Sequence, residues 1–304
     1  MTTRKLLALS SAFAALLVFA PAALAAFPGK NGLIAFEKSK GAVPDIWVLD
    51  PKTGRQTDLT RTPQVYEKEA AFSPDGKTIA FSWQDYRSNT NGIGVIRSDG
   101  KGMKHVTTGD EDHFMYQPSF TADGKTILFT KRFDPNSGYS IFGVSPSGGA
   151  QRQITFGGNP EGEEDLFPVG SPDGRFAFLH ASLGAPAVEQ IAGLRGGGTA
   201  PAGEHAISDW SPDGRRFVYE SSHGIFSSAI DGSGEVKLAD LPTKDMEPAY
   251  SPDGKWVVWT NENSHDLWIV PASGGTPKNL THQAGFEHGP SWGRAVKKSK
   301  RHRH

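Results

Sequence analysis

Residues 247–260, EPAYSPDGKWVVWT, contain the pattern that decides the fold. Pro248-Ala249-Tyr250 is an extended, aromatic lead-in. Ser251-Pro252-Asp253-Gly254 has the composition of a tight turn, because proline fixes φ at the first central position and glycine is favoured at the last position. The run Trp256–Trp259 that follows consists of β-branched and aromatic residues, which favour strands. A single hairpin of this kind cannot bury its own apolar face, so it needs copies of itself or another partner.

Copies of this pattern occur along most of the chain. FSPDGKTIAF starts at Phe72, FTADGKTILF at Phe120, GSPDGRFAFL at Gly170, WSPDGRRFVY at Trp210 and YSPDGKWVVW at Tyr250, and a shortened copy, PSWGR, places Trp292 in the aromatic position. The spacing between successive copies is therefore 40 to 50 residues. Such a period, made of short strands, is typical of propeller blades. The sequence predicts an all-β, six-bladed β-propeller of four-stranded blades.

The two ends of the chain are predicted to share one blade. Residues 31–36 resemble the second strand of a repeat, residues 45–50 a third strand and residues 55–60 a fourth, but no first strand precedes them. The shortened copy around Trp292 supplies that first strand. Pairing the N-terminal and C-terminal strands in this way would close the ring and remove its open edges.

The first 25 residues have the features of a secretory signal peptide. Arg4 and Lys5 precede an apolar run that is short for a membrane span, and Ala23-Leu24-Ala25 fits a cleavage site after Ala25. We therefore predict a signal peptide at 1–25, a propeller at 27–292 and a basic, disordered tail at 293–304. The mature protein is expected to be secreted or periplasmic, monomeric and without a transmembrane segment.

Composition narrows the choice of functions. The chain has no cysteine, which excludes disulfides, thiolate metal sites and a cysteine nucleophile. Without the basic residues of the leader and of 297–304, 25 Lys and Arg face 33 Asp and Glu. This excess of negative charge argues against nucleic acid as a partner.

The repeats FSPDGKTIAF, WSPDGRRFVY and YSPDGKWVVW, each followed by a Gly-rich turn and a Leu-Thr-like fourth strand, resemble the TolB-type β-propeller repeat. The resemblance covers about residues 29–292. It implies the propeller fold, whereas the same blades serve in binding modules, in accessory domains of peptidases and in polysaccharide lyases. TolB itself has an α/β domain before its propeller, and here the first blade follows the leader directly.

Catalytic motifs do not stand out in this sequence. It has no GxSxG elbow, HExxH, P-loop, GxGxxG or EF-hand loop. The serine and aspartate of each SPDG repeat from blade to blade, which identifies them as turn residues rather than catalytic ones. The loops that join the second strand to the third, and one blade to the next, are long and varied. Since binding usually resides in variable loops on a rigid scaffold, we predict the functional face there.

One set of polar residues recurs on that face. Five residues before each aromatic position stand Glu67, Met115, Asp165, His205, Asp245 and Glu287, and two residues later come Glu69 and Glu247. First strands line the channel of a propeller, so these positions should surround its mouth. The predicted ligand-binding residues are Glu67, Glu69, Asp112, His113, Asp165, His205, Asp245, Glu247, Glu287 and His288.

A ring of carboxylates predicts a cation or an amine-bearing ligand. The metal candidates are Asp165, His205, Asp245 and Glu287, and oxygen donors favour Ca²⁺ in the central channel. The rival hypothesis is that the ring receives a basic group of a protein partner. The alternative to both is that these residues cap turns and face solvent.

Three functions remain open from the sequence. The first is a non-catalytic binding module for a protein or an envelope glycan, which the absence of catalytic motifs favours. The second is a propeller enzyme, lyase or hydrolase, acting on envelope polysaccharide; it requires convergence of His180, His205, His223, His265 and His288. The third is a structural remnant of a larger TolB-like assembly.

Overall fold

The structure is a computed structural model that describes residues 26–39, 41, 43–133, 137–158, 162–194, 200–203, 207–221, 223–240, 245–261, 263–282 and 285–297. The predicted leader at 1–25, His205 and most of the predicted tail therefore lie outside the described residues. For 200–203 and 245–246 the structure gives the backbone only. None of the described residues forms a helix, and so none forms one long and apolar enough to cross a membrane.

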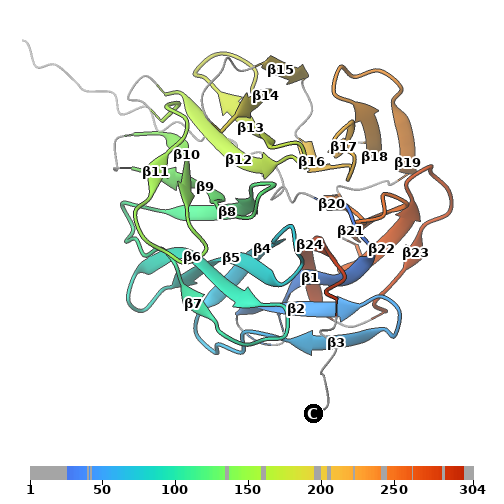
Figure 1. The fold of residues 1–304 in the computed structure, drawn as a ribbon, viewed down its shortest axis with the longest axis horizontal. Coiled ribbons are helices and arrows are strands. Elements are labelled where there is room, and N and C mark those ends of the chain that lie inside the picture. Colours follow the sequence, from blue (N-terminus) through green and yellow to red (C-terminus); the bar gives the residue numbers. More distant parts are fainter. Residues whose placement is uncertain are drawn as a thin grey trace, which may run out of the picture.

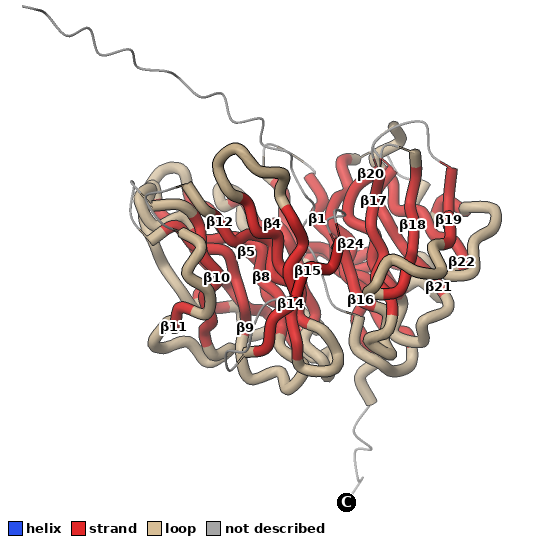
Figure 2. The backbone as a smooth tube through the Cα atoms, turned by 90° about the horizontal axis from the view of Figure 1, so that it is seen from above, coloured by secondary structure: helices blue, strands red, loops and turns tan. Residues whose placement is uncertain are grey.

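The described strands form six antiparallel sheets of four strands each, arranged around a common centre (Figures 1 and 2). Blade 1 consists of β24 (Phe286–Arg294), β1 (Asn31–Ser39), β2 (Pro44–Asp50) and β3 (Arg55–Asp58). Blade 2 consists of β4 (Tyr66–Phe72), β5 (Thr78–Asp85), β6 (Thr90–Arg97) and β7 (Lys104–His105). Blade 3 consists of β8 (Met115–Phe120), β9 (Ile127–Arg132), β10 (Tyr139–Val144) and β11 (Arg152–Gln153).

The remaining blades repeat the same order. Blade 4 consists of β12 (Glu164–Gly170), β13 (Arg175–Ala181), β14 (Val188–Gly193) and β15 (Ala200–Gly203). Blade 5 consists of β16 (Ile207–Trp210), β17 (Arg216–Ser221), β18 (Gly224–Ala229) and β19 (Val236–Asp240). Blade 6 consists of β20 (Asp245–Tyr250), β21 (Trp256–Asn261), β22 (Asp266–Pro271) and β23 (Lys278–Asn279). The predicted six-bladed, all-β propeller is confirmed.

Blade 1 closes the ring with strands from both ends of the chain. The C-terminal strand β24 pairs antiparallel with β1, placing Ile34 opposite Trp292 and Lys38 opposite Glu287. In Figure 1 the blue β1 lies beside the red β24. The strand ends at Arg294, two residues beyond the predicted end of the propeller, and the Ala295 amide donates to the Lys30 carbonyl. The prediction that the two ends share a blade is confirmed.

The second strand of each blade supplies most of the core. These strands contain continuous apolar runs such as Ile79-Ala80-Phe81 and Val257-Val258-Trp259, in which every residue is fully buried. Neighbouring blades cover both faces of the sheet, so the strands do not alternate between apolar and polar residues. At about 25 cal/mol for each Å² of apolar surface removed from water, this burial is the main force that holds neighbouring blades together.

The SPDG segments act as turns, as predicted. In the first of them the Ser73 hydroxyl donates to Asp75 Oδ1 at 2.8 Å, and the Lys77 amide donates to the same oxygen at 3.0 Å. The Thr78 amide donates to Ser73 Oγ at 3.0 Å. The same contacts recur around Asp213 and Asp253, so these polar residues satisfy the backbone of the turn. The five SPDG-type turns lie at one end of the channel, here called the turn face; the opposite end is the loop face.

Gly170 replaces the aromatic residue of the repeat in blade 4 because the neighbouring backbone occupies that space. A Cβ at this position would lie 2.0 Å from the Phe120 carbonyl oxygen. The Gly170 amide instead donates to Ser119 Oγ of blade 3 at 3.0 Å. This hydrogen bond joins blade 4 directly to blade 3.

Two of the outermost strands end before the Leu-Thr-like pair that the repeat pattern predicts in them. β7 ends just before Val106-Thr107, and β23 ends just before Leu280-Thr281. The threonine side chain continues the ladder: Thr107 Oγ1 accepts from the Ile93 amide at 2.8 Å, and Thr281 Oγ1 from the Leu267 amide at 3.0 Å. A hydroxyl replaces a backbone carbonyl where the outermost strand leaves the sheet.

Candidate functional site at the channel mouth

Each innermost strand contains a β-bulge close to its loop-face end. In blade 2 the register with β5 shifts between Lys68 and Ala71. Within the described residues, left-handed backbone conformations with φ of 54° to 65° occur at the same position of the repeat, at Glu69, Gln117, Phe167, Glu247 and Gly289. A bulge re-aims the side chains that precede it. The orientation of the channel-mouth residues therefore depends on this bulge.

The predicted carboxylates at the first position are buried inside the blades rather than exposed to the channel. Glu67 and Glu287 are fully buried and Asp165 is 3% exposed. Glu287 accepts from Lys38 Nζ at 2.7 Å, and Gln56 Nε2 lies 3.3 Å from the same oxygen. Asp165 accepts from the Gly157 amide and lies 2.8 Å from His180 Nδ1. Glu67 and Glu287 thus contact residues of blade 1 and of the loop after it, whereas Asp165 contacts His180 of blade 4 and the loop before that blade.

The structure describes the side chains of two of the four metal candidates, and these two lie apart. The metal candidates Asp165 and Glu287 lie in blades 4 and 1, His205 lies outside the described residues, and only the backbone of Asp245 is described. Among the described side chains no group of three or more His, Asp or Glu could hold a metal ion. The calcium site stays a prediction.

The other predicted residues divide between the channel and the outer loops. Glu69 and Glu247 lie at the bulge and His288 lies next to it, whereas Asp112 and His113 lie in the loop before β8. Asp112 is exposed, and His113 Nδ1 lies 2.7 Å from Asp110 Oδ1. The structure thus groups Glu69, Glu247 and His288 near the mouth and separates Asp112 and His113 from them.

The residue between the two predicted positions is the one that faces solvent. Lys68 is exposed, and Tyr116, Leu166 and His288 are half-buried, although Glu67 and Met115 beside them are buried. These four residues belong to innermost strands, so they line the channel. Burial lowers the pKa of His288, and the nearby His265 and Lys68 lower it further. At these positions of the described strands, the side chains that face the channel are Lys68, Tyr116, Leu166 and His288.

An aromatic cavity of about 330 Å³ opens beside these residues, between blades 2, 3 and 4. Tyr116 packs edge-on against Tyr139, with ring centroids 5.4 Å apart, and Phe114 lies 5.6 Å from Tyr116. Burial raises the pKa of Tyr116 well above its usual range, so its hydroxyl stays protonated at neutral pH. The aromatic lining consists of Tyr66, Trp83, Phe114, Tyr116, Tyr139 and Phe167.

Buried carboxylates connect the bulge of one blade to the next. Glu37 Oε1 of blade 1 accepts from the Glu69 amide at 2.7 Å, and Glu69 Oε2 accepts from the Gln117 amide of blade 3 at 2.7 Å. The Glu69 carboxylate also accepts from the Ser82 hydroxyl at 2.6 Å. The Phe167 amide of blade 4 likewise donates to Thr130 Oγ1 of blade 3 at 3.1 Å. Glu69 therefore fixes the floor of the aromatic cavity.

Burial of Glu67 predicts a pH-dependent stability. Desolvation raises its pKa from 4.5 to about 7, more than the nearby Thr60 and Thr62 hydroxyls lower it. The folded state then holds this proton more tightly than the unfolded state, so the free energy of unfolding falls as the pH rises from about 4.5 to 7. Glu67→Gln should flatten this slope and, at pH 8, raise the free energy of unfolding by about 2 kcal/mol.

Urea unfolding at pH 5 and pH 8 measures this effect. Glu37, whose pKa burial also raises to about 7, should leave part of the slope in the Glu67→Gln variant. The exposed Glu111→Gln is the matched control and should leave the slope unchanged. An equal slope in wild type and Glu67→Gln would show that Glu67 does not carry the effect.

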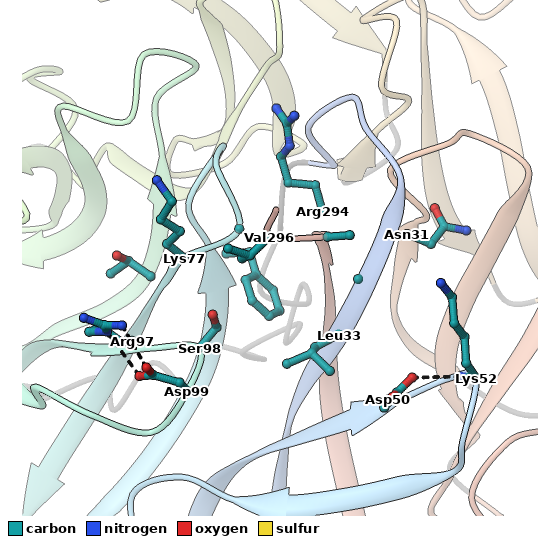
Figure 3. Close-up of a pocket in the computed structure, with 15 residues that line it drawn as sticks. Asn31, Leu33, Asp50, Lys52, Lys77, Arg97, Ser98, Asp99, Arg294 and Val296 are labelled. Carbon is teal, nitrogen blue, oxygen red and sulfur yellow. Dashed lines mark hydrogen bonds and ion pairs between the residues drawn. The ribbon is translucent and has the colours of Figure 1, made fainter. Parts of the chain in front are cut away.

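A larger cavity, of about 660 Å³, lies on the turn face between blades 1 and 2 (Figure 3). Arg97 Nη2 donates to Asp99 Oδ2 at 2.8 Å, and the backbone amide of Lys52 donates to Asp50 Oδ1 at 3.0 Å. The sequence predicts the functional face at the other end of the channel. We therefore take the aromatic cavity on the loop face as the candidate site.

A second polar group lies on the loop face of blade 4. Asp165 Oδ1 contacts His180 Nδ1 at 2.8 Å, and His180 Nε2 lies 3.3 Å from Ser182 Oγ. The aspartate is buried, and a cavity of about 360 Å³ adjoins the aspartate and the histidine. A hydroxyl, an imidazole and a buried carboxylate in this order are the elements of a nucleophilic triad.

The other described histidines of the predicted set lie in other blades, and His223 directly precedes β18 of blade 5. His265 lies before β22 and His288 in β24, with ring centroids 6.0 Å apart, at the junction of blades 6 and 1. The convergence that the enzyme hypothesis requires is therefore not met by His180, His265 and His288.

The repeat pattern also appears in known proteins. No protein-family model matches the chain. An uncharacterized peptidase, YuxL of Bacillus subtilis, is 25% identical over 227 residues, covering 70% of this chain and 33% of its own length. The Tol-Pal system protein TolB of Francisella tularensis is 23% identical over 197 residues, covering 51% of this chain and 44% of its own.

Solved structures give the same result at the level of the fold. A protein assigned as TolB from Agrobacterium tumefaciens superimposes with a TM-score of 0.60 at 19% identity, covering 82% of this chain and 88% of that one. The chain spans only 28% to 44% of the length of the first curated relatives it matches. Together with the six blades and their SPDG turns, these likenesses confirm the predicted resemblance: the chain carries a TolB-like six-bladed β-propeller.

Proposed function

We propose that this chain is a non-catalytic, extracytoplasmic binding module. In this proposal the loop-face mouth of the channel takes an extended segment of a protein partner, and the aromatic cavity holds an apolar or aromatic side chain of that segment. The extracytoplasmic location follows from the predicted leader at 1–25.

The observation that supports this proposal most is the aromatic cavity itself. Its walls come from three different blades, whose bulges are fixed by hydrogen bonds such as that from the Gln117 amide to Glu69. Such a site is largely preformed, so little ordering is needed on binding. Aromatic residues in water-excluding pockets supply much of the binding energy at protein interfaces.

Charge at the mouth favours an acidic partner segment. Lys68 is exposed at the rim of the cavity and supplies a positive charge there. The buried Glu69 carboxylate is already engaged by Ser82 and Gln117. In this proposal an acidic segment takes the place of the amine-bearing ligand of the sequence-based hypothesis. Affinity should weaken as salt screens the Lys68 contact.

The test is capture from the native extracytoplasmic fraction with three immobilised proteins: wild type, Tyr116→Ala and Met103→Ser. Met103 is an exposed apolar residue of the turn between β6 and β7, so it is the matched control on the turn face. We expect a protein retained by wild type and Met103→Ser, and reduced at least about tenfold by Tyr116→Ala.

Two outcomes would contradict the proposal. A partner lost equally with Met103→Ser would move the interface to the turn face. If no protein is retained by wild type, the third hypothesis, a structural remnant of a larger assembly, becomes the better account.

A hydrolase is the second candidate function, and Asp165, His180 and Ser182 are the observation that favours it. In this reading Ser182 Oγ is the nucleophile, His180 the general base and Asp165 the group that orients the imidazole. The similarity to a protein named as a peptidase is compatible with it, although the matched part covers 33% of that protein.

A fluorophosphonate probe distinguishes the two functions. An activated Ser182 should be labelled covalently, and Ser182→Ala and Asp165→Asn should abolish or strongly reduce the labelling. Ser88→Ala serves as control, since Ser88 is an exposed serine whose hydroxyl lies 2.7 Å from Thr90 Oγ1. Absence of labelling in wild type would remove the hydrolase and leave the binding module.

A further inference from the structure

Asp209 is a buried carboxylate on the innermost strand of blade 5. Only 1% of it is exposed. Its Oδ1 accepts from the backbone nitrogens of Ala26 and Trp210, both at 2.7 Å, and its Oδ2 accepts from the Tyr250 amide of blade 6 at 2.6 Å. Asp209 thus joins two neighbouring blades to the start of the described chain.

Among the described residues, no lysine, arginine or histidine forms an ion pair with Asp209. Arg216, on the next strand, donates instead to Ser227 and to the Gly234 carbonyl. Arg175 pairs with Asp173. Burial raises the pKa of Asp209 well above its usual range, against the three backbone hydrogen bonds. The carboxylate is hydrogen-bonded, but its charge has no counter-ion there.

The segment that begins at Ala26 is held firmly against the turn face. Ala26 is 2% exposed in a cluster with residues of blades 5 and 6, whereas Phe27, 6% exposed, belongs to a cluster of blades 2 and 3. The Gly29 amide donates to the Pro252 carbonyl at 2.9 Å. Because Ala26 and Phe27 are adjacent in the chain and pack on opposite sides of the ring, the chain crosses the centre of the ring here. The segment therefore covers the turn-face end of the channel.

Ala26 is also the residue that follows the predicted cleavage site Ala23-Leu24-Ala25. We propose that removal of the leader after Ala25 makes the Ala26 nitrogen a free α-ammonium group, which serves as the internal counter-ion of Asp209 and locks the amino terminus into the channel. Hydrolysis adds OH from water to the Ala25 carbonyl and H to the Ala26 nitrogen. The released amine then takes up one proton, because a free α-amine has a pKa of about 8.

This ion pair would form only in the processed protein. In the precursor the Ala26 nitrogen is an uncharged amide, which donates one hydrogen bond but supplies no charge. Cleavage would therefore stabilise the closed ring after export and leave the loop-face mouth as the open end of the channel. The inference is independent of what binds at that mouth.

The first readout is the mass of the exported protein, which should begin at Ala26. The second is a thermal unfolding cycle of four proteins: a chain beginning at Ala26, the same chain with Gly-Ser placed before Ala26, and both with Asp209→Asn. Asp240→Asn, an exposed aspartate at the end of β19, is the matched control. The Gly-Ser extension should lower the melting temperature by at least about 5 °C with Asp209 present, and by no more than about 1 °C with Asp209→Asn.

If the Gly-Ser extension lowers the melting temperature equally with Asp209 and with Asp209→Asn, its effect is steric crowding alone and the proposal is overturned. An exported protein that begins at a residue other than Ala26 would overturn it as well. Amine acylation of the wild-type protein covers the case in which Asp209→Asn fails to fold. The Ala26 amine should react at least about tenfold more slowly in the native protein than in urea, because it is buried and paired. Equal rates would also overturn the proposal.

Discussion

Deletion of residues 286–304 is expected to abolish cooperative folding. It removes β24, the innermost strand of blade 1, and leaves β1 with an unpaired edge facing the channel. The deletion also exposes Ile34 and Phe36, which are fully buried in the closed ring. Each such side chain contributes about 2 kcal/mol when buried, against a total stability of about 5–15 kcal/mol. Far-ultraviolet circular dichroism during heating measures the loss.

The matched control removes only 297–304. This shorter deletion leaves β24 intact together with the hydrogen bond from Ala295 to Lys30, so its melting temperature should stay within about 1 °C of the full mature chain. If the longer deletion melts like the full chain, the two ends do not share a blade.

The second large effect is expected for Lys38→Met. Lys38 and Glu287 are 4% and 0% exposed, and their 2.7 Å contact joins β1 to β24 inside the closing blade. Removing the ammonium leaves Glu287 buried and uncompensated except for Gln56. We expect a loss of about 3–5 kcal/mol in the free energy of unfolding, measured by urea denaturation at pH 7.

The double variant Lys38→Met/Glu287→Leu separates this cause from lost packing. It removes both charges, so most of the lost stability should return. A double variant as unstable as the single one would show that the charge of Glu287 is not responsible. Glu287→Gln alone should also destabilise the protein, because Glu287 has Lys38 as its partner.

The fold could be predicted from the sequence because its determinants are local. Turn residues such as Asp75 bond within four residues of themselves, and the apolar second strands follow at once. Closure was also predictable, since the first blade lacks one strand and the shortened copy at Trp292 supplies it. Strand ends were less predictable, because the Thr107 and Thr281 hydroxyls accept hydrogen bonds that a backbone carbonyl of the next strand would otherwise accept.

The orientation of the channel residues could not be predicted from strand alternation. A residue with left-handed backbone, such as Glu69, interrupts the regular alternation of side chains between the two faces of the strand. Glu67 is therefore buried inside the blade, and Lys68 is exposed. One signal was present: the shortened copy has Gly289 at this position, and glycine is the residue that tolerates positive φ most readily. The aromatic cavity was missed because Tyr66, Tyr116 and Tyr139 come from three separate strands.

The most direct test of the binding proposal is site-specific photocrosslinking in the native extracytoplasmic setting. A photoreactive amino acid replaces Lys68 at the rim of the aromatic cavity, or Met103 on the turn face; both positions are exposed, so both variants should fold. The proposal predicts one discrete protein adduct from position 68, none from position 103, and loss of the adduct when Tyr116→Ala is added. Absence of an adduct at position 68, or the same adduct at position 103, would contradict a partner site at the channel mouth.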